Sequence, residues 1–152
     1  MLTKQEVKTI LNHKVQLIRF DLMTYQSCKA LIKAVDEQIQ REKSVSLEAM
    51  PPTDRIVGGK LTGAKATEFD SAVEGLAITL ADLSSERLGY IKTVERVDRM
   101  LEKLNEVDRR LIKLHFFEGK TYNMLSEEPG YKYSSEAIRS KIRRILRKLA
   151  KN

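Results

Sequence analysis

The side chains best suited to bind a ligand lie near the carboxyl end of the sequence, in residues 134–149. One set is apolar and recurs at helical spacing: Ile138, Ile142, Ile145, Leu146 and Leu149. A second set points the other way, with Arg139 on its flank: Glu136, Ser140, Arg143, Arg144 and Arg147. Basic residues and no acidic ones follow from Arg139 to Lys151. The pattern predicts a helix with one face for a core and one for a polyanion.

The net charge is unevenly distributed along the chain. The 152 residues carry a formal charge of +7, and residues 105–152 hold 12 basic and six acidic side chains. The first 104 residues are therefore nearly neutral. A basic region on a neutral body indicates a polyanionic partner for that region. The alternative is a solvated surface that only favours solubility.

Several other classes of site are not indicated. Cys28 is the only cysteine, and His13 and His115 are far apart, so neither a disulfide nor a zinc site is expected. No nucleophile–base pair or paired carboxylates suggest an enzyme, and no cofactor motif occurs. No stretch of ~20 apolar residues could cross a membrane. We expect a protein of the reducing cytoplasm with no membrane partner.

The elements that position the basic helix are also predicted to be helical. The chain has no Trp, only seven Gly and three Pro, which indicates an all-α composition. Thr3 and Glu6 form a capping-box pattern ahead of a helix that runs to about Lys43. Lys14 and Asp21 interrupt its apolar stripe, and a break near residues 27–28 is an alternative to one continuous helix.

A second long helix is predicted from Thr67 onwards, after a Pro- and Gly-rich loop at residues 44–65. Only Arg87 breaks its heptad pattern. The seam contains Val73, Leu76, Leu80, Leu83, Tyr90, Val94, Val97 and Leu101. The pattern fits a coiled-coil-like antiparallel hairpin in residues 1–104, and a homodimer would cover its remaining apolar surface. Whether the seam is used within or between chains is left open.

Residues 105–152 are predicted to form a small three-helix domain. Asn105, Thr121 and Ser134 precede the three helices as caps, and Gly119 ends the first of them. The first helix is expected at 106–118 and the second at 122–128. The inner face of the first helix is expected to be Val107, Leu111, Leu114 and Phe117. The order of elements is that of a helix-turn-helix, so the expected fold is an all-α hairpin followed by a helix-turn-helix domain.

The segment LNEVDRRLIKLHFFEGKTYNMLSEEPGYKYSSEAIRSKIRRILRKL resembles region 4 of primary sigma factors. More specifically, it is similar to phage late-gene transcription regulators of the ArpU/RinA type. The matching features are Leu104, Arg109, the FEGKTY segment at 117–122, Leu125, Gly130 and the serine-led, arginine-rich last helix. The resemblance covers about a third of the chain. It implies a DNA-binding domain in the cytoplasm of a bacterial host cell.

The last helix is expected to read the major groove with its first two turns. Candidates for contacts with base edges are Ser135, Glu136, Arg139, Ser140 and Arg143. By resemblance, Glu136 and Arg139 match positions that read bases in sigma-type domains. Candidates for phosphate contacts are Lys120, Thr121, Arg144, Arg147, Lys148 and Lys151.

The expected function is therefore sequence-specific binding of double-stranded DNA by a phage or prophage transcription regulator, such as a late-gene activator. Two alternatives remain open. The first is a sigma-like factor that associates with bacterial RNA polymerase, although residues 1–104 lack clustered aromatics for melting DNA. The second is the DNA-recognition subunit of a phage packaging machine, similar to a small terminase, which would form a ring in place of a dimer.

Overall fold

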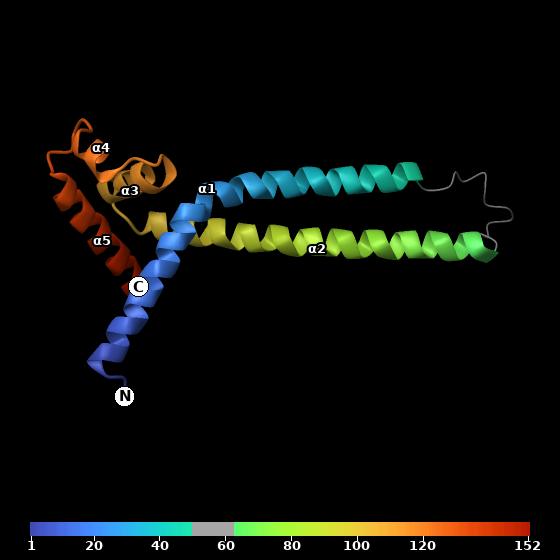
Figure 1. Cartoon of the computed structure of the whole chain (residues 1–152), viewed down its shortest axis with the longest axis horizontal. Coiled ribbons are helices and arrows are strands. Elements are labelled where there is room, and N and C mark those ends of the chain that lie inside the picture. The colour runs from blue at the N-terminus through green and yellow to red at the C-terminus, as the bar shows by residue number, and fades with distance from the viewer. Residues whose placement is uncertain (50–62) are drawn as a thin grey trace. The chain divides into compact units, whose positions relative to one another are not determined.

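The described residues are mostly helical (Figure 1). The computed structural model describes residues 1–49 and 63–152, with side chains for 1–45 and 70–152. In chain order the elements are α1 (Lys4–Ala49), α2 (Gly63–Glu102), α3 (Glu106–Ile112), one π-helical turn η2 (Lys113–Phe117), α4 (Tyr122–Ser126) and α5 (Ser135–Lys151). This part of the chain contains no strand, so the all-α prediction is confirmed. None of the described helices is both long and apolar enough to cross a membrane.

The chain divides into two compact units. The first unit contains residues 1–28 and 92–152, and the second contains residues 29–91. The boundary expected between residues 104 and 105 lies inside the first unit, because residues from α1 and from the end of α2 share that unit with α3 to α5.

Helix α1 begins with the capping box that the sequence predicts. The Thr3 amide donates to Glu6 Oε2 at 2.7 Å, and the Glu6 amide donates to Thr3 Oγ1 at 3.2 Å. The hydrogen bond from the Thr3 amide, followed by one from the Thr3 side chain, lowers the pKa of the Glu6 carboxyl. The helix has no break near residues 27–28 and continues past Lys43 to Ala49.

The expected bounds of the loop at 44–65 were wrong at both ends. Residues 44–49 belong to α1, and residues 63–65 belong to α2, which begins four residues before Thr67. No Pro or Gly occurs before Pro51, so nothing in the backbone chemistry ends α1 at Lys43. The remainder of the predicted loop, residues 50–62, lies outside the described residues.

The first unit has one hydrophobic core to which both ends of the chain contribute. Its buried members come from α1, the end of α2 and all the later elements: Val15, Leu22, Tyr25, Val97, Leu101, Leu104, Leu111, Ile112, Leu114, Leu125, Tyr131, Ile138, Ile142, Ile145, Leu146, Leu149 and Ala150. Burial of this apolar surface is the main stabilising contribution to the unit.

Tyr25 joins three elements of the first unit. Its ring stacks on Phe117 of η2 with centroids 4.6 Å apart, and its hydroxyl donates to Asp98 Oδ1 of α2 at 2.6 Å. Burial, followed by the hydrogen bond to Asp98, raises the pKa of Tyr25 to about 12. The first half of α1 is therefore fixed to the C-terminal elements by specific contacts as well as by apolar packing.

Asp21 and Arg87, two of the charged residues that interrupt the apolar stripes, each form an ion pair between α1 and α2. In the first unit, Arg96 donates to both oxygens of Asp21, at 3.1 and 3.2 Å, which raises the pKa of the guanidinium. In the second unit, Arg87 Nε lies 2.6 Å from Asp36 Oδ1. Both pairs are partly exposed, so each contributes only about 0–1 kcal/mol. Their main effect is to fix which residues of the two helices face each other.

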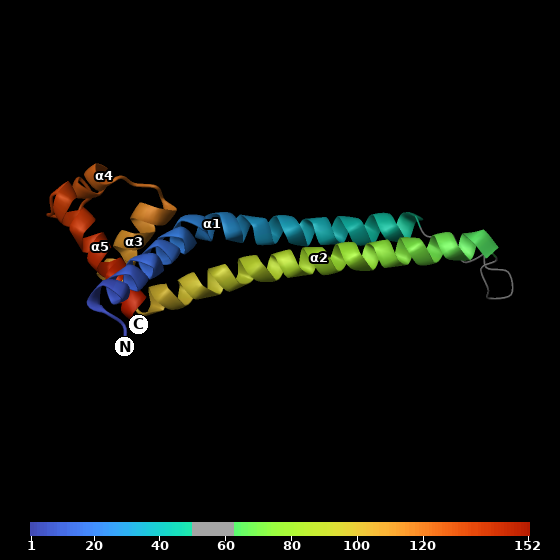
Figure 2. The same ribbon diagram turned by 60° about the horizontal axis from the view of Figure 1, so that its bottom comes forward.

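The second unit contains two helical segments that lie side by side in both views (Figures 1 and 2). Val35 and Leu83 are its buried apolar residues among those described. Large apolar side chains remain exposed, including Leu31, Ile78 and Leu88. Two helical segments thus bury only a narrow strip of the apolar surface that the sequence provides.

The buried face of α3 differs from the expected one. Leu111 and Leu114 are buried as predicted, and Phe117 is half-buried against the core. Val107 was expected to face inward but is 56% exposed, whereas Ile112 is fully buried. The buried face of α3 therefore includes Ile112 and not Val107. Steps of three and four residues from Val107 do not reach Ile112, so the periodicity did not indicate it.

Arg109 of α3 closes the carboxyl end of α2. Its Nε donates to the Leu101 carbonyl and its terminal nitrogen donates to the Leu104 carbonyl, each at 2.9 Å. The last carbonyls of a helix lack partners within the helix, and a cation is favourable beside them. Arg109 therefore fixes the turn between α2 and α3.

We expect Arg109→Met to lower the free energy of unfolding by about 1.5–3 kcal/mol, because it removes two charge-assisted hydrogen bonds. Urea titration followed by circular dichroism measures this loss. Arg99→Met is the matched control, since Arg99 is exposed on α2 and should change stability by no more than about 0.5 kcal/mol. Equal losses in the two variants would show that Arg109 has no special role.

Candidate nucleic-acid interface

The connections on either side of α4 have the local structure that the sequence predicts. Thr121 caps α4 by accepting from the Met124 amide at 3.3 Å, and Ser134 caps α5 by accepting from the Ala137 amide at 3.2 Å. Gly119 and Gly130 have φ values of 71° and 94°, which side chains other than glycine rarely adopt. These two glycines allow the chain to reverse before α4 and before α5.

His115 holds the connection between η2 and α4 in place. Its Nδ1 lies 2.8 Å from the Lys120 backbone oxygen, and its ring stacks on Tyr122 with centroids 4.7 Å apart. Because a carbonyl can only accept, Nδ1 carries the proton in this contact. His115 therefore links η2 to the start of α4.

Helix α5 separates its apolar and basic residues by face. The apolar side comprises six buried residues: Ile138, Ile142, Ile145, Leu146, Leu149 and Ala150. The basic side is exposed and comprises Arg139, Arg143, Arg144, Arg147, Lys148 and Lys151. The buried side fixes α5 on the core of the first unit, and the basic side is left facing solvent.

The five residues expected at base edges lie on the outer part of α5. Glu136, Arg139, Ser140 and Arg143 are exposed, and Ser135 is half-buried in the first turn. Arg139 lies at the edge of the exposed face, next to buried Ile138. A nucleic acid can contact the four exposed side chains without any rearrangement of the hydrophobic core.

Four of the six phosphate candidates are also free to bind an anion. Arg144, Arg147, Lys148 and Lys151 are exposed, and within the described residues none of them forms an ion pair with a carboxylate. Their charges are therefore compensated only by solvent and salt. This is the condition under which basic side chains release counterions when they bind a polyanion.

Lys120 and Thr121 are less suited to a phosphate role. Lys120 forms an ion pair with Glu128 and lies 4.0 Å from Glu118, so carboxylates already compensate its charge. The backbone amides at the start of α4 were expected to hold the phosphate, but the Met124 amide already donates to the Thr121 hydroxyl as the cap of this helix. The sequence alone does not indicate the Lys120–Glu128 pair, because the fold of α4 and the turn after it brings these residues together.

The predicted oligomerisation seam is used in part within the chain. Val97 and Leu101 are buried in the core of the first unit, where Val94 packs beside them, so they are not free for a second chain. In the second unit Leu83 is buried, while the remaining seam residues are half-buried or exposed: Leu76, Leu80, Tyr90 and Val73. The intermolecular part of the prediction is therefore restricted to the second unit.

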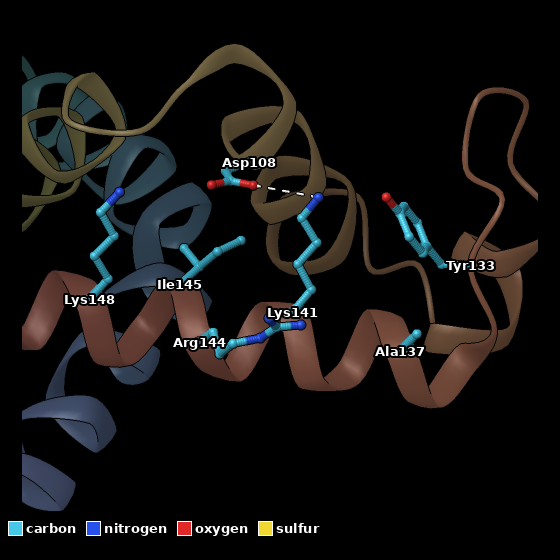
Figure 3. Close-up of a pocket in the computed structure, with 7 residues that line it drawn as sticks. All are labelled: Asp108, Tyr133, Ala137, Lys141, Arg144, Ile145 and Lys148. Carbon is cyan, nitrogen blue, oxygen red and sulfur yellow. Dashed lines mark ion pairs between the residues drawn. The ribbon is translucent and has the colours of Figure 1, made fainter.

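One basic residue of α5 was not among the candidates. Lys141 is half-buried on the flank of α5 that faces α3, with its Nζ 3.8 Å from Asp108 Oδ1 and 5.4 Å from the centroid of the Tyr133 ring. These residues line a groove together with Ala137, Arg144, Ile145 and Lys148 (Figure 3). Helical spacing could have identified Lys141 as a neighbour of Arg144 and Lys148, but its proximity to Asp108 depends on tertiary packing.

Comparison with known proteins adds no relative: the chain matches no protein-family model, no curated protein and no solved structure.

Proposed function

We propose that this protein is a sequence-specific DNA-binding transcription regulator that reads the major groove of double-stranded DNA with α5. One observation carries the proposal: six exposed basic side chains on α5, backed by six buried apolar ones, have no carboxylate partner among the described residues. If the basic face had been buried or paired with acids, the proposal would have had no basis. A cationic helix face of this kind can bind phosphates and still present side chains to base edges.

We further propose that α4, the turn that follows it and α5 form a helix-turn-helix. The capped start of each helix and the positive φ of Gly130 between them support this arrangement. The sequence resemblance to sigma region 4 and to ArpU/RinA-type late-gene regulators supports it independently and suggests a phage or prophage promoter as the target. In such a domain the N-terminal turns of α5 reach the bases, and the later turns lie along the backbone.

We also propose that α1 and α2 form a coiled-coil-like antiparallel hairpin, and that this hairpin dimerises. Ion pairs between the two helices within each unit support the hairpin: Asp21–Arg96 and Asp36–Arg87. Exposed apolar residues of the second unit, such as Ile78 at 64% and Leu88 at 51%, support a second chain as their cover. A dimer would place two α5 helices on two half-sites and raise the affinity of each weak module.

The test is to measure binding of the purified chain to labelled duplex DNA across a salt series, followed by a footprint on the DNA that flanks its gene. We expect log K to fall linearly with log salt, with a slope near −0.9 for each phosphate contacted. Protection of paired half-sites about 34–36 Å apart would identify a dimer. Light scattering on the same sample gives the oligomeric state.

Other outcomes separate the alternatives. A requirement for core RNA polymerase before any DNA is bound would favour a sigma-like factor, and a ring-sized mass in solution would favour a DNA-packaging subunit. Lack of binding to every duplex at low ionic strength, both with and without core RNA polymerase, would exclude all three.

A further inference from the structure

A groove lies along the flank of α5 that faces α3. Four α5 residues spaced by four, three and four positions form one wall of this α5 groove: Ala137, Lys141, Arg144 and Lys148. Ile145 lies between Lys141 and Lys148. Asp108 of α3 and Tyr133, which precedes α5, complete the lining (Figure 3). The volume of about 420 Å³ is large enough for a phosphate group and part of a sugar.

The lining of the α5 groove is cationic. The lining contains three cationic side chains, Lys141, Arg144 and Lys148, and one carboxylate, that of Asp108, so it carries an excess of two positive charges. In Figure 3 the Lys141 and Lys148 side chains both extend from α5 toward α3, on either side of Ile145. Three cations on one flank of a helix, with a small Ala137 at the end of the row, favour an extended anionic ligand over a neutral one.

The Asp108–Lys141 pair is loose enough to be opened by a stronger anion. Asp108 Oδ1 is 3.8 Å from Lys141 Nζ, beyond hydrogen-bond distance. The other oxygen, Oδ2, accepts from the Asn105 side-chain amide at 3.3 Å, and the Asp108 amide donates to Asn105 Oδ1 at 2.8 Å. Asp108 is therefore held by the cap of α3, while Lys141 is free to move toward a ligand in the groove.

We propose that the α5 groove binds a backbone phosphate of the DNA, with Lys141 as its main ligand and Asp108 as a competing anion. This inference rests on the proposed function, since it adds a contact between the DNA backbone and a second flank of the same helix. The groove flank lies beside the face that carries Ser140 and Arg147, so a phosphate bound there would fix the angle at which α5 enters the major groove. Because Asp108 competes with the phosphate for Lys141, it would reduce the affinity of any DNA that enters the groove.

The test compares four proteins on a labelled random-sequence duplex of 20 base pairs: wild type, Lys141→Gln, Asp108→Asn and the control Lys33→Gln. Lys33 is exposed on α1 in the second unit. We expect Lys141→Gln to make the salt slope shallower by about 0.9, which is roughly an eightfold loss of affinity at 0.1 M salt. Asp108→Asn keeps the contacts with Asn105 and should tighten binding several-fold. Lys33→Gln should leave the slope unchanged.

The outcomes are separable from those for the proposed function. If wild type binds the duplex and neither the Lys141 nor the Asp108 variant changes affinity or slope, the groove assignment is wrong and the function stands. If wild type binds no duplex, both fail. Should Lys141→Gln lose its helical circular dichroism, Lys141→Met replaces it, since methionine keeps most of the apolar stem and removes the charge, with the same expected change in slope.

A second measurement separates a backbone phosphate from a free ion. Titration calorimetry of wild type with inorganic phosphate alone should give no saturable heat. Saturable binding that Lys141→Gln abolishes would assign the groove to the free ion and overturn the backbone assignment.

Discussion

Replacing Leu146 with alanine is expected to lower the free energy of unfolding of the first unit by about 2–5 kcal/mol. Leu146 is fully buried on the apolar side of α5, so the substitution removes apolar contacts and leaves a cavity that rigid neighbours fill only in part. Urea titration followed by circular dichroism measures the change. Because α5 carries the basic face, weaker fixation of this helix should also reduce DNA affinity at temperatures near the transition.

The matched control for Leu146 is its neighbour in sequence. Arg147→Ala alters the exposed side of the same helix turn and should change the free energy of unfolding by no more than about 0.5 kcal/mol. Its effect should fall on DNA binding, with a slope shallower by about one unit on every sequence. If both variants lost the same stability, the division of α5 into a core side and a solvent side would be incorrect.

The second large effect is expected at Arg139. Arg139→Ala should weaken binding to the preferred DNA site by about 1–3 kcal/mol, or roughly 5- to 150-fold, and relax the preference at one base pair. The physical reason is that a guanidinium can donate two parallel hydrogen bonds to O6 and N7 of guanine. Competition binding with a set of single-base variants of the footprinted site measures both changes.

Arg139→Lys separates base recognition from charge. The lysine keeps the positive charge but lacks the planar fork of donors, so the salt slope should stay as in wild type while the base preference is lost. A uniform loss on all sequences after Arg139→Ala, with full recovery by lysine, would identify Arg139 as a phosphate ligand instead.

Features that depend on a few neighbouring residues could be predicted from the sequence. The caps at Thr3, Asn105, Thr121 and Ser134 were predicted because a short polar side chain before an amphipathic segment satisfies free amides two or three residues later. The two faces of α5 followed from residue spacing in the same way.

Features that depend on tertiary contacts could not be predicted. Nothing local indicates that Tyr25 stacks on Phe117, 92 positions later, or that Lys141 lies near Asp108. The same limitation explains the error at Val107, since helical spacing gives a stripe but not which edge of it the neighbouring helices cover. The heptad pattern likewise does not show which seam residues pack within the chain. Val97 and Leu101 belong to the core of the first unit.

The shared core of the first unit has a consequence for the order of events during synthesis. Leu22 and Tyr25 pack with Ile138 and Leu146, so the nascent chain must grow by more than 110 residues after Tyr25 before these partners exist. At about 5–20 residues per second this takes roughly 6–20 s. During this interval the apolar surface of the first helix is exposed outside the ribosome, where a chaperone can bind it. Folding of this unit therefore waits until α5 has been synthesised.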